Sequence, residues 1–242
     1  MIDLHCHILP DIDDGPANIN GSIKIAETAC KEGVRCIFAT PHHGNGVYEV
    51  YLKQIEDYCG LLNEALRQKK IHLFVYSGAE VHIHSSILND LAAGNVITLG
   101  NMGMAVLLEL PEVYILDGIE MIFKQMVNSG ILPIVAHPER NPLILKQPFH
   151  LERFIYAGAR MQVTAGSVVG DYGPLSQNCV IDMLKKDQVH FLGSDMHPGR
   201  KYRMADFKKK VSKLTTAEKL YWITEGACLD LVFTEKMRQN CN

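Results

Sequence analysis

Short apolar runs and longer amphipathic segments alternate along the whole of this chain, and the alternation limits the folds open to it. Seven runs have the length and apolar content of buried strands: 2–5, 34–40, 72–77, 104–110, 132–136, 160–164 and 189–193. Helical patterns lie between them, such as 23–32, 50–68 and 118–128. Strand followed by helix, repeated in this way, predicts a parallel sheet that is buried on both faces.

The number of strand–helix units separates two kinds of parallel sheet. Seven units, with no glycine-rich dinucleotide turn after the first run, favour a closed or nearly closed barrel; an open Rossmann sheet is the alternative. The 242 residues suit a barrel of about 200–250 residues, and no linker or repeat divides them. We therefore expect one α/β domain over residues 1–242, a (β/α)7 TIM-like barrel. The helical pattern after residue 214 is expected to close it.

Charge and hydropathy exclude two classes of partner. A net charge of −3 gives no basic field for nucleic acid. No run approaches the ~18 apolar residues of a membrane span, and the first residues carry no signal segment. We expect a cytoplasmic protein with no membrane insertion and no nucleic-acid partner.

Possible metal ligands gather at the ends of the predicted strands. They are His5, His7, His42, Glu80, Glu109, His137, Asp195 and His197. In a parallel barrel, the carboxyl ends of the strands share one rim, so these side chains should converge. The two-residue period of a strand puts His5 and His7 on one face and turns Cys6 away.

The ligand types indicate the kind of ion. Imidazoles and carboxylates without thiolates suit zinc, manganese or iron rather than a structural zinc site. The set is larger than one ion needs, and so many buried polar groups would cost several kcal/mol unless paired or metallated. More than one cation is therefore expected.

Seven motifs in order resemble those of a known family. They are D-x-H-x-H at 3–7, D-D-G-P at 13–16, P-H at 41–42, G-A-E at 78–80, E-L at 109–110, A-H-P-E-R at 136–140 and S-D-M-H at 194–197. This pattern is similar to the polymerase and histidinol phosphatase (PHP) superfamily. Within it, the chain resembles the bacterial metal-dependent tyrosine-protein phosphatases of capsule and exopolysaccharide operons. The resemblance runs from residue 2 to about residue 203.

The resemblance implies a distorted seven-stranded barrel with three divalent metal ions, manganese first, with iron, zinc or cobalt as alternatives. It implies a first ion held by His5, His7, Glu80 and Asp195, with Glu80 bridging to a second held by Glu109 and His137. A third would be held by Asp14, His42 and His197. Arg140 matches a substrate-binding arginine of the family; Arg200 is the first choice for another, and Arg203 the second.

The charge of such a site suits phosphate. Three divalent ions with four carboxylates leave a centre of about +2, which attracts a phosphate dianion. Close metal ions lower the pKa of bound water towards ~7 and supply hydroxide for in-line attack on phosphorus. Arginine adds a planar fork for two phosphate oxygens.

The charge indicates phosphate chemistry, and the resemblance implies a metal-dependent protein-tyrosine phosphatase whose partner is a phosphotyrosine protein, specifically a bacterial tyrosine kinase. A thiol mechanism is disfavoured, because it requires Cys-x5-Arg and no cysteine here, Cys6 included, has arginine six positions on. A histidinol-phosphate phosphatase, an amidohydrolase and a non-catalytic binding module are the alternatives. A second His-x-His, His82 and His84, is interpreted as a loop or helix-start feature without a role.

Overall fold

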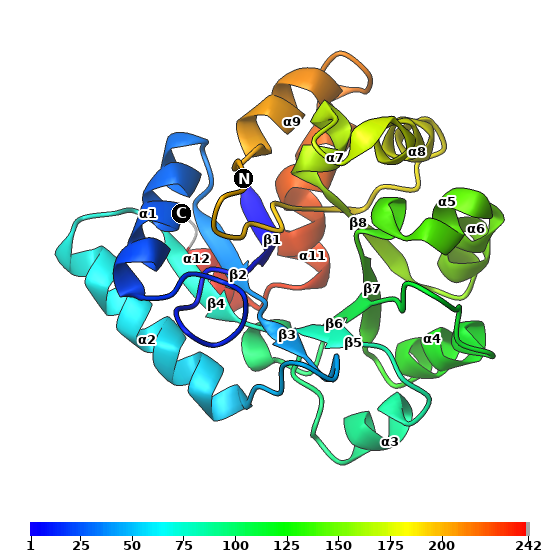
Figure 1. Cartoon of the computed structure of the whole chain (residues 1–242), viewed down its shortest axis with the longest axis horizontal. Helices are drawn as coiled ribbons and strands as arrows, with labels where there is room; N and C mark the ends of the chain where they lie inside the picture. The colour runs from blue at the N-terminus through cyan, green and yellow to red at the C-terminus, as the bar shows by residue number, and fades with distance from the viewer. Residues whose placement is uncertain (241–242) are drawn as a thin grey trace.

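The structure, a computed structural model, describes residues 1–240 and has a curled parallel sheet surrounded by helices (Figure 1). The strands are β1 (Ile2–Cys6), β2 (Cys36–Ala39), β3 (His42–His43), β4 (Phe74–Ser77), β5 (Glu80–His82), β6 (Ala105–Glu109), β7 (Leu132–Ala136), β8 (Arg160–Thr164) and β9 (Phe191–Gly193).

The α-helices are α1 (Ile19–Lys31), α2 (Leu52–Gln68), α3 (Ile87–Ala92), α4 (Ile119–Asn128), α5 (Pro142–Lys146), α6 (Phe149–Tyr156), α7 (Ala165–Val169), α8 (Gly173–Lys185), α9 (Met204–Val211), α10 (Ala217–Tyr221), α11 (Ala227–Leu231) and α12 (Glu235–Asn240). Two 3-10 helices, η1 (Leu99–Asn101) and η2 (Pro138–Arg140), and one π-helix, η3 (Trp222–Gly226), complete the elements. None of the helices described is long and apolar enough to cross a membrane.

All strand pairs are parallel, as predicted, and they form two hydrogen-bonded sheets. One has the order β1-β2-β4, the other β3-β5-β6-β7-β8-β9. Backbone bonds also join β1 to the chain after β9: Asp195 N–H donates to His5 O at 2.8 Å, and His7 N–H to Met196 O at 3.1 Å. The sheet therefore curls until its first and last strands meet.

The predicted count of seven strands is not confirmed, since residues 1–240 form nine. The additional ones, β3 and β5, follow β2 and β4 after breaks of two residues. Pro41 lies in the first break and has no N–H for the ladder, so the second predicted run ends there. His82, interpreted from the sequence as a loop or helix-start residue, is instead the last residue of β5.

Two apolar layers follow the alternation of the strands. Outward-facing residues pack against the surrounding helices, and they include Ile37, Val75, Val106, Leu108, Val135 and Leu192. Inward-facing residues form a second cluster inside the curl, and they include Ile2, Leu4, Phe38, Leu107, Ile134 and Phe191. Strands such as β1, β2 and β6 bury both of their faces, which explains the continuous apolar runs in the sequence.

The C-terminal segment closes the inner cluster, as predicted. Residues of α11, α12 and their connection pack among the inward-facing strand residues: Ala227, Cys228, Val232, Phe233 and Met237. The end of the interior that this segment covers is therefore apolar. The side chains that continue the strands at their carboxyl ends are polar, and they form the site described next.

Candidate metal centre

β1 delivers His5 and His7 to the same face, as the period of a strand predicts. Their Nε2 atoms lie 3.1 Å apart, and both side chains are fully buried. Cys6 belongs to the outer layer, whereas Ile2 and Leu4 belong to the inner one. The face changes because the register of β1 shifts between Asp3 and Cys6, as at a β-bulge.

Glu80, the first residue of β5, lies at the middle of the cluster. Its Oε2 is 3.2 Å from His5 Nε2, 3.4 Å from His7 Nε2 and 3.1 Å from His42 Nδ1. Its Oε1 is 2.7 Å from His137 Nε2. One carboxylate therefore touches four imidazoles that come from three other parts of the chain.

Asp195 completes the group around His5 and His7. Its Oδ1 lies 3.6 Å from the Nε2 atom of each. Ligands about 2.0–2.1 Å from a single ion lie roughly 3.0–3.5 Å from one another. The separations among His5, His7, Glu80 and Asp195 are close to that range.

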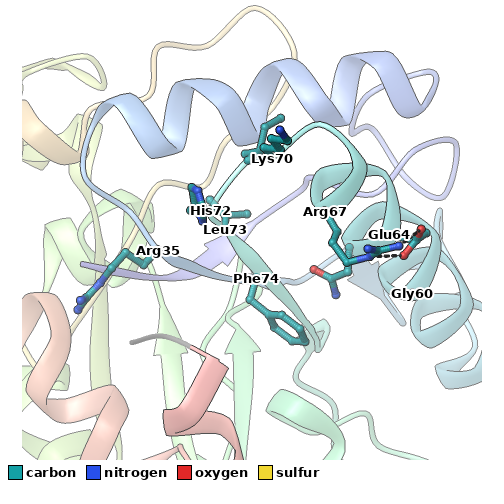
Figure 2. Close-up of a pocket in the computed structure, with 10 residues that line it drawn as sticks. Arg35, Gly60, Glu64, Arg67, Lys70, His72, Leu73 and Phe74 are labelled. Atoms are coloured by element: carbon teal, nitrogen blue, oxygen red, sulfur yellow. Dashed lines mark hydrogen bonds and ion pairs between the residues drawn. The ribbon is translucent and has the colours of Figure 1, made fainter.

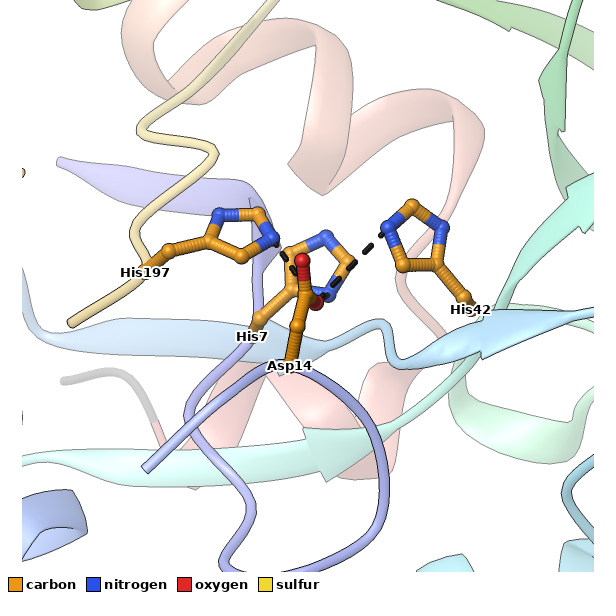
Figure 3. A group of neighbouring side chains, drawn as sticks. All are labelled: His7, Asp14, His42 and His197. Carbon is orange, nitrogen blue, oxygen red and sulfur yellow. Dashed lines mark ion pairs between the residues drawn. The ribbon is translucent and has the colours of Figure 1, made fainter. Parts of the chain in front are cut away.

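Asp14 gathers a second group, which Figure 3 shows. Its Oδ1 is 3.1 Å from His197 Nε2, 3.8 Å from His42 Nε2 and 3.8 Å from His7 Nδ1. Asp14 lies in the loop after β1 and is half-exposed, so this group faces outward. The predicted third set, Asp14, His42 and His197, is brought together.

The predicted second set, Glu80, Glu109 and His137, is brought together only in part. Glu109 Oε2 lies 3.9 Å from His42 Nδ1, and these two with Glu80 form a third group of candidate ligands. His137 reaches the same group through Glu80. His82 Nδ1 also lies 3.6 Å from Glu109 Oε2, which the sequence did not predict.

The backbone is strained where two of these side chains leave their strands. His137 has φ 30° and Asp195 has φ 48°, in the left-handed region that non-glycine residues rarely adopt. Gly193, two residues before Asp195, leaves room for a neighbour: a Cβ there would lie 2.6 Å from His5 Cβ and 2.7 Å from Gln162 Nε2. No larger residue fits this approach of β9 to β1.

Two side chains that the sequence analysis did not select orient the histidines. Asp13 Oδ2 accepts a hydrogen bond from His7 Nδ1 at 2.6 Å, and Gln162 Oε1 lies 3.0 Å from His5 Nδ1. Because both contacts are made at Nδ1, the Nε2 atoms of His5 and His7 are left facing the other ligands. Two signals in the sequence could have indicated Asp13 and Gln162: the second aspartate beside Asp14, and the glutamine in the middle of the predicted strand 160–164.

The predicted substrate arginines separate into two kinds. Arg140 and Arg200 both pair with Asp195 Oδ2, Arg200 at 2.8 Å, so both lie at the edge of the cluster. Arg203 is held away from it by Asp171, at 2.8 and 3.1 Å, and by Asp206 at 2.8 Å.

The ionisation of the cluster reflects its crowding. Burial disfavours a charge on His7, but the bond to Asp13 and the carboxylate of Glu80 outweigh it and raise the pKa of the imidazole to about 10. Burial likewise disfavours a charged Glu80, yet His5 and His137 hold its pKa well below the usual range. The pKa of His197 falls to about 4, because it is buried and faces His7. The cluster thus favours anionic oxygens and draws positive charge towards them.

Unpaired buried atoms show where that positive charge fits. Glu80 Oε2, His42 Nδ1 and His197 Nε2 are buried side-chain atoms with no hydrogen-bond partner. The Nε2 atoms of His5 and His7 face each other at 3.1 Å, so either a proton or a cation must lie between them. Divalent cations satisfy all of these atoms, and imidazole with carboxylate is a donor set that suits them.

Cys6 does not have the surroundings of a nucleophile. It is fully buried in the outer layer. Burial and the nearby Asp3 raise the pKa of its thiol well above the ordinary value. The reactive thiolate is therefore disfavoured, in agreement with the missing Cys-x5-Arg motif.

A hollow of about 690 Å³ beside the start of β4 has a different character (Figure 2). The hollow lies at the amino end of β4, whereas Glu80 follows the carboxyl end of that strand. Both arginines that line it are engaged in ion pairs: Arg67 with Glu64 at 2.7 Å, and Arg35 with Glu225. Among residues 1–240, no group of candidate ligands lies in this hollow, and the centre at the carboxyl ends of the strands is the stronger functional site.

The fold and the site together define a class: a parallel α/β protein whose histidines and carboxylates form a candidate centre for divalent metal ions. The profile of the family described as "Capsular polysaccharide synthesis, CpsB/CapC" matches residues 1–223. The chain belongs to this family.

Two relatives illustrate the similarity. The chain is 34% identical over 229 residues to the tyrosine-protein phosphatase YwqE of Bacillus subtilis, covering 94% of this chain and 90% of that one. It is 34% identical over 197 residues to the putative tyrosine-protein phosphatase CapC of Staphylococcus aureus, covering 81% of this chain and 77% of that one.

Solved structures agree with the fold. A structure from work on YwqE of Bacillus subtilis and CpsB of Streptococcus pneumoniae, described as unique metal-dependent tyrosine phosphatases, has a TM-score of 0.89 at 32% identity. It covers 100% of this chain and 96% of that one. A TatD-like protein of Archaeoglobus fulgidus shares the fold alone, with a TM-score of 0.52 at 14% identity, covering 96% of this chain and 100% of that one.

Proposed function

We propose that this chain is a metal-dependent phosphatase that hydrolyses phosphotyrosine in proteins. One observation carries the proposal: Glu80 Oε2 is buried among three imidazoles at 3.1–3.4 Å without a hydrogen bond, beside a carboxylate that holds two arginines. Such a centre requires cations and presents guanidinium groups to an anion. The tyrosine-phosphatase names of the relatives support phosphotyrosine as the substrate.

The proposed metal content is three divalent ions, manganese first. The first would be held by His5, His7, Glu80 and Asp195, the second by Glu80, Glu109 and His137, and the third by Asp14, His42 and His197. The ligand distances support the first and third sets most directly. When bound, such ions lower the pKa of water, so that hydroxide is available near neutral pH to attack phosphorus, and they neutralise phosphate oxygens.

The residues of the chain bind and orient the substrate. Arg140 and Arg200 would each donate to phosphate oxygens, because a guanidinium presents parallel N–H donors. In the structure both bond to Oδ2 of Asp195, while Oδ1 faces His5 and His7. Asp195 thus connects the ligand cluster to the arginines. Arg203, with two carboxylates around it, is the weaker candidate for substrate contact.

Several broader features belong to the same proposal. If β2 with β3, and β4 with β5, are each counted as one interrupted strand, the fold becomes the distorted (β/α)7 barrel expected from the sequence, in one domain over residues 1–242. The proposed partner is a phosphorylated bacterial tyrosine kinase, which the capsule-synthesis family supports. A cytoplasmic location is proposed from the sequence.

The test is phosphate release from a phosphotyrosine peptide and from histidinol phosphate, measured with manganese and again after chelation. Hydrolysis of the peptide, abolished by the chelator, is the expected result. Preference for histidinol phosphate would instead assign the chain to that reaction. Hydrolysis of neither by protein that contains metal would favour the amidohydrolase or binding-module alternatives.

A further inference from the structure

An aromatic side chain lies between the two arginines at the edge of the centre. The guanidinium Cζ of Arg140 is 4.4 Å from the centroid of the Tyr172 ring, and that of Arg200 is 6.0 Å from it. Arg200 Nη1 also donates to the Tyr172 hydroxyl at 3.3 Å. Tyr172 therefore contacts both arginines, through its ring and through its hydroxyl.

We propose that Tyr172 is a positioning residue that holds Arg140 and Arg200 in one orientation for binding phosphate. This inference rests on the proposed function, because it assigns the two arginines to the phosphate. A guanidinium stacked on an aromatic face keeps its in-plane N–H donors free for an anion. Two cations that share Asp195 repel each other, and a ring beside them offsets part of that repulsion.

Tyr172 is itself held in place from two directions. It lies in the turn between α7 and α8, where its neighbour Asp171 accepts two hydrogen bonds from Arg203, at 2.8 and 3.1 Å. On the other side, its ring packs against Gly166, where a Cβ would lie 3.0 Å from the ring. Arg203 thus anchors the turn that carries Tyr172, which gives this arginine a role outside substrate contact.

The arrangement is preorganised before any phosphate binds. Long arginine side chains lose rotamer freedom when they bind an anion, and contacts that fix them beforehand reduce that loss. Removing the ring should therefore weaken phosphate binding while the metal ligands stay in place. Removing only the hydroxyl should have a smaller effect, since Arg140 keeps its stacking.

The experiment uses manganese-loaded full-length protein and inorganic phosphate as the probe. We expect Tyr172→Ala to raise the Kd for phosphate, and the KM for the phosphotyrosine peptide, roughly threefold to thirtyfold, with unchanged metal content. We expect Tyr172→Phe to raise the Kd roughly two- to tenfold. Tyr156→Ala is the matched control, because Tyr156 is exposed and has Lys124 Nζ 5.7 Å from its ring, away from the centre. It should leave both constants unchanged.

Comparison of a double variant with a triple variant tests whether Tyr172 acts through the arginines. In an Arg140→Ala, Arg200→Ala background, Tyr172→Ala should add little further loss. An unchanged phosphate Kd in Tyr172→Ala alone, or an undiminished effect in the background without arginines, would overturn the inference. If the wild-type protein binds phosphate but leaves the peptide intact, the proposed function fails while the Kd still decides the role of Tyr172. Wild-type protein that does not bind phosphate would overturn both.

Discussion

The carboxylate of Asp13 accepts a 2.6 Å hydrogen bond from Nδ1 of His7, and this bond decides which nitrogen of the ring faces the cluster. The other oxygen of Asp13 accepts from Gly15 N–H at 2.9 Å, and Oδ2 accepts in addition from His42 N–H at 3.1 Å. Asp13 is therefore hydrogen-bonded to two of the candidate ligands, to the ring of His7 and to the backbone of His42. Such outer partners fix the tautomer of a metal-binding imidazole and increase its basicity.

Asp13→Asn should weaken metal binding about 10- to 100-fold. Asparagine has one acceptor oxygen for three donors, and its NH2 group would face one of them. Affinity for manganese, measured by competition with a chelating dye, checks the prediction. Asp11→Asn is the matched control, because Asp11 is an exposed aspartate in the same loop. An affinity for Asp13→Asn within twofold of the wild type would contradict the orienting role.

His7→Ala should lose phosphatase activity more than about a hundredfold, while Cys6→Ser should keep most of it. The two residues are neighbours, but His7 faces the ligand cluster and Cys6 faces the outer layer. Phosphate release by both variants, with metal content measured alongside, separates the metal-dependent mechanism from a thiol mechanism. An inactive Cys6→Ser protein with normal metal content and a normal melting temperature would exclude the metal-dependent assignment.

Gly193→Ala should destabilise the protein by about 1–3 kcal/mol, because the new Cβ would overlap His5 Cβ and Gln162 Nε2. The clash is at the base of the centre, so metal affinity should fall as well. Gly60→Ala is the control: Gly60 lies on the exposed face of α2 with open space around its Cα. That variant should gain roughly 0.5–1 kcal/mol from helix propensity. Urea unfolding of both variants measures the contrast, and equal stability of Gly193→Ala and wild type would disprove the close approach.

The sequence predicted best what depends on a regular period. Alternating strands and helices predicted the parallel sheet, and the spacing of His5 and His7 predicted their shared face. The same period fails at the irregularity in β1, which places Leu4 in the inner layer and Cys6 in the outer one. The sequence of β1, Ile-Asp-Leu-His-Cys, contains no glycine or proline to mark the bulge, so only the structure reveals it.

The residues that orient the ligands and the arginines were harder to predict, because their contacts join parts of the chain that are distant in sequence or lie in irregular turns. Gln162 is distant in sequence from His5, and their contact exists only because β8 and β9 complete the curl. The resemblance grouped Asp14 with His197, but nothing in the sequence shows that the neighbouring Asp13 turns towards His7. Tyr172 had no signal of its own, since it reaches the arginines from an irregular turn.

His190 should make the fold sensitive to acid at a point far from the centre. Burial, with the nearby Arg160, lowers the pKa of this histidine from 6.5 to about 4. Its Nδ1 accepts a hydrogen bond from Met161 N–H at 3.1 Å, which only the neutral ring can do. Above pH 6.5 the ring is neutral in both the folded and the unfolded chain, and His190 contributes no pH dependence. As the pH falls from about 6.5 to about 4, His190 becomes protonated in the unfolded chain but stays neutral in the folded chain. The free energy of unfolding therefore decreases over that window.

His190→Asn keeps an acceptor for Met161 N–H and removes the titration, so its free energy of unfolding should fall less between pH 7 and pH 4. The difference from the wild type should be roughly 1–3 kcal/mol. Urea unfolding of both proteins at a series of pH values measures it, and the contributions of the histidines in the centre cancel in the comparison. Parallel pH profiles for the two proteins would show that His190 is not held neutral in the folded chain.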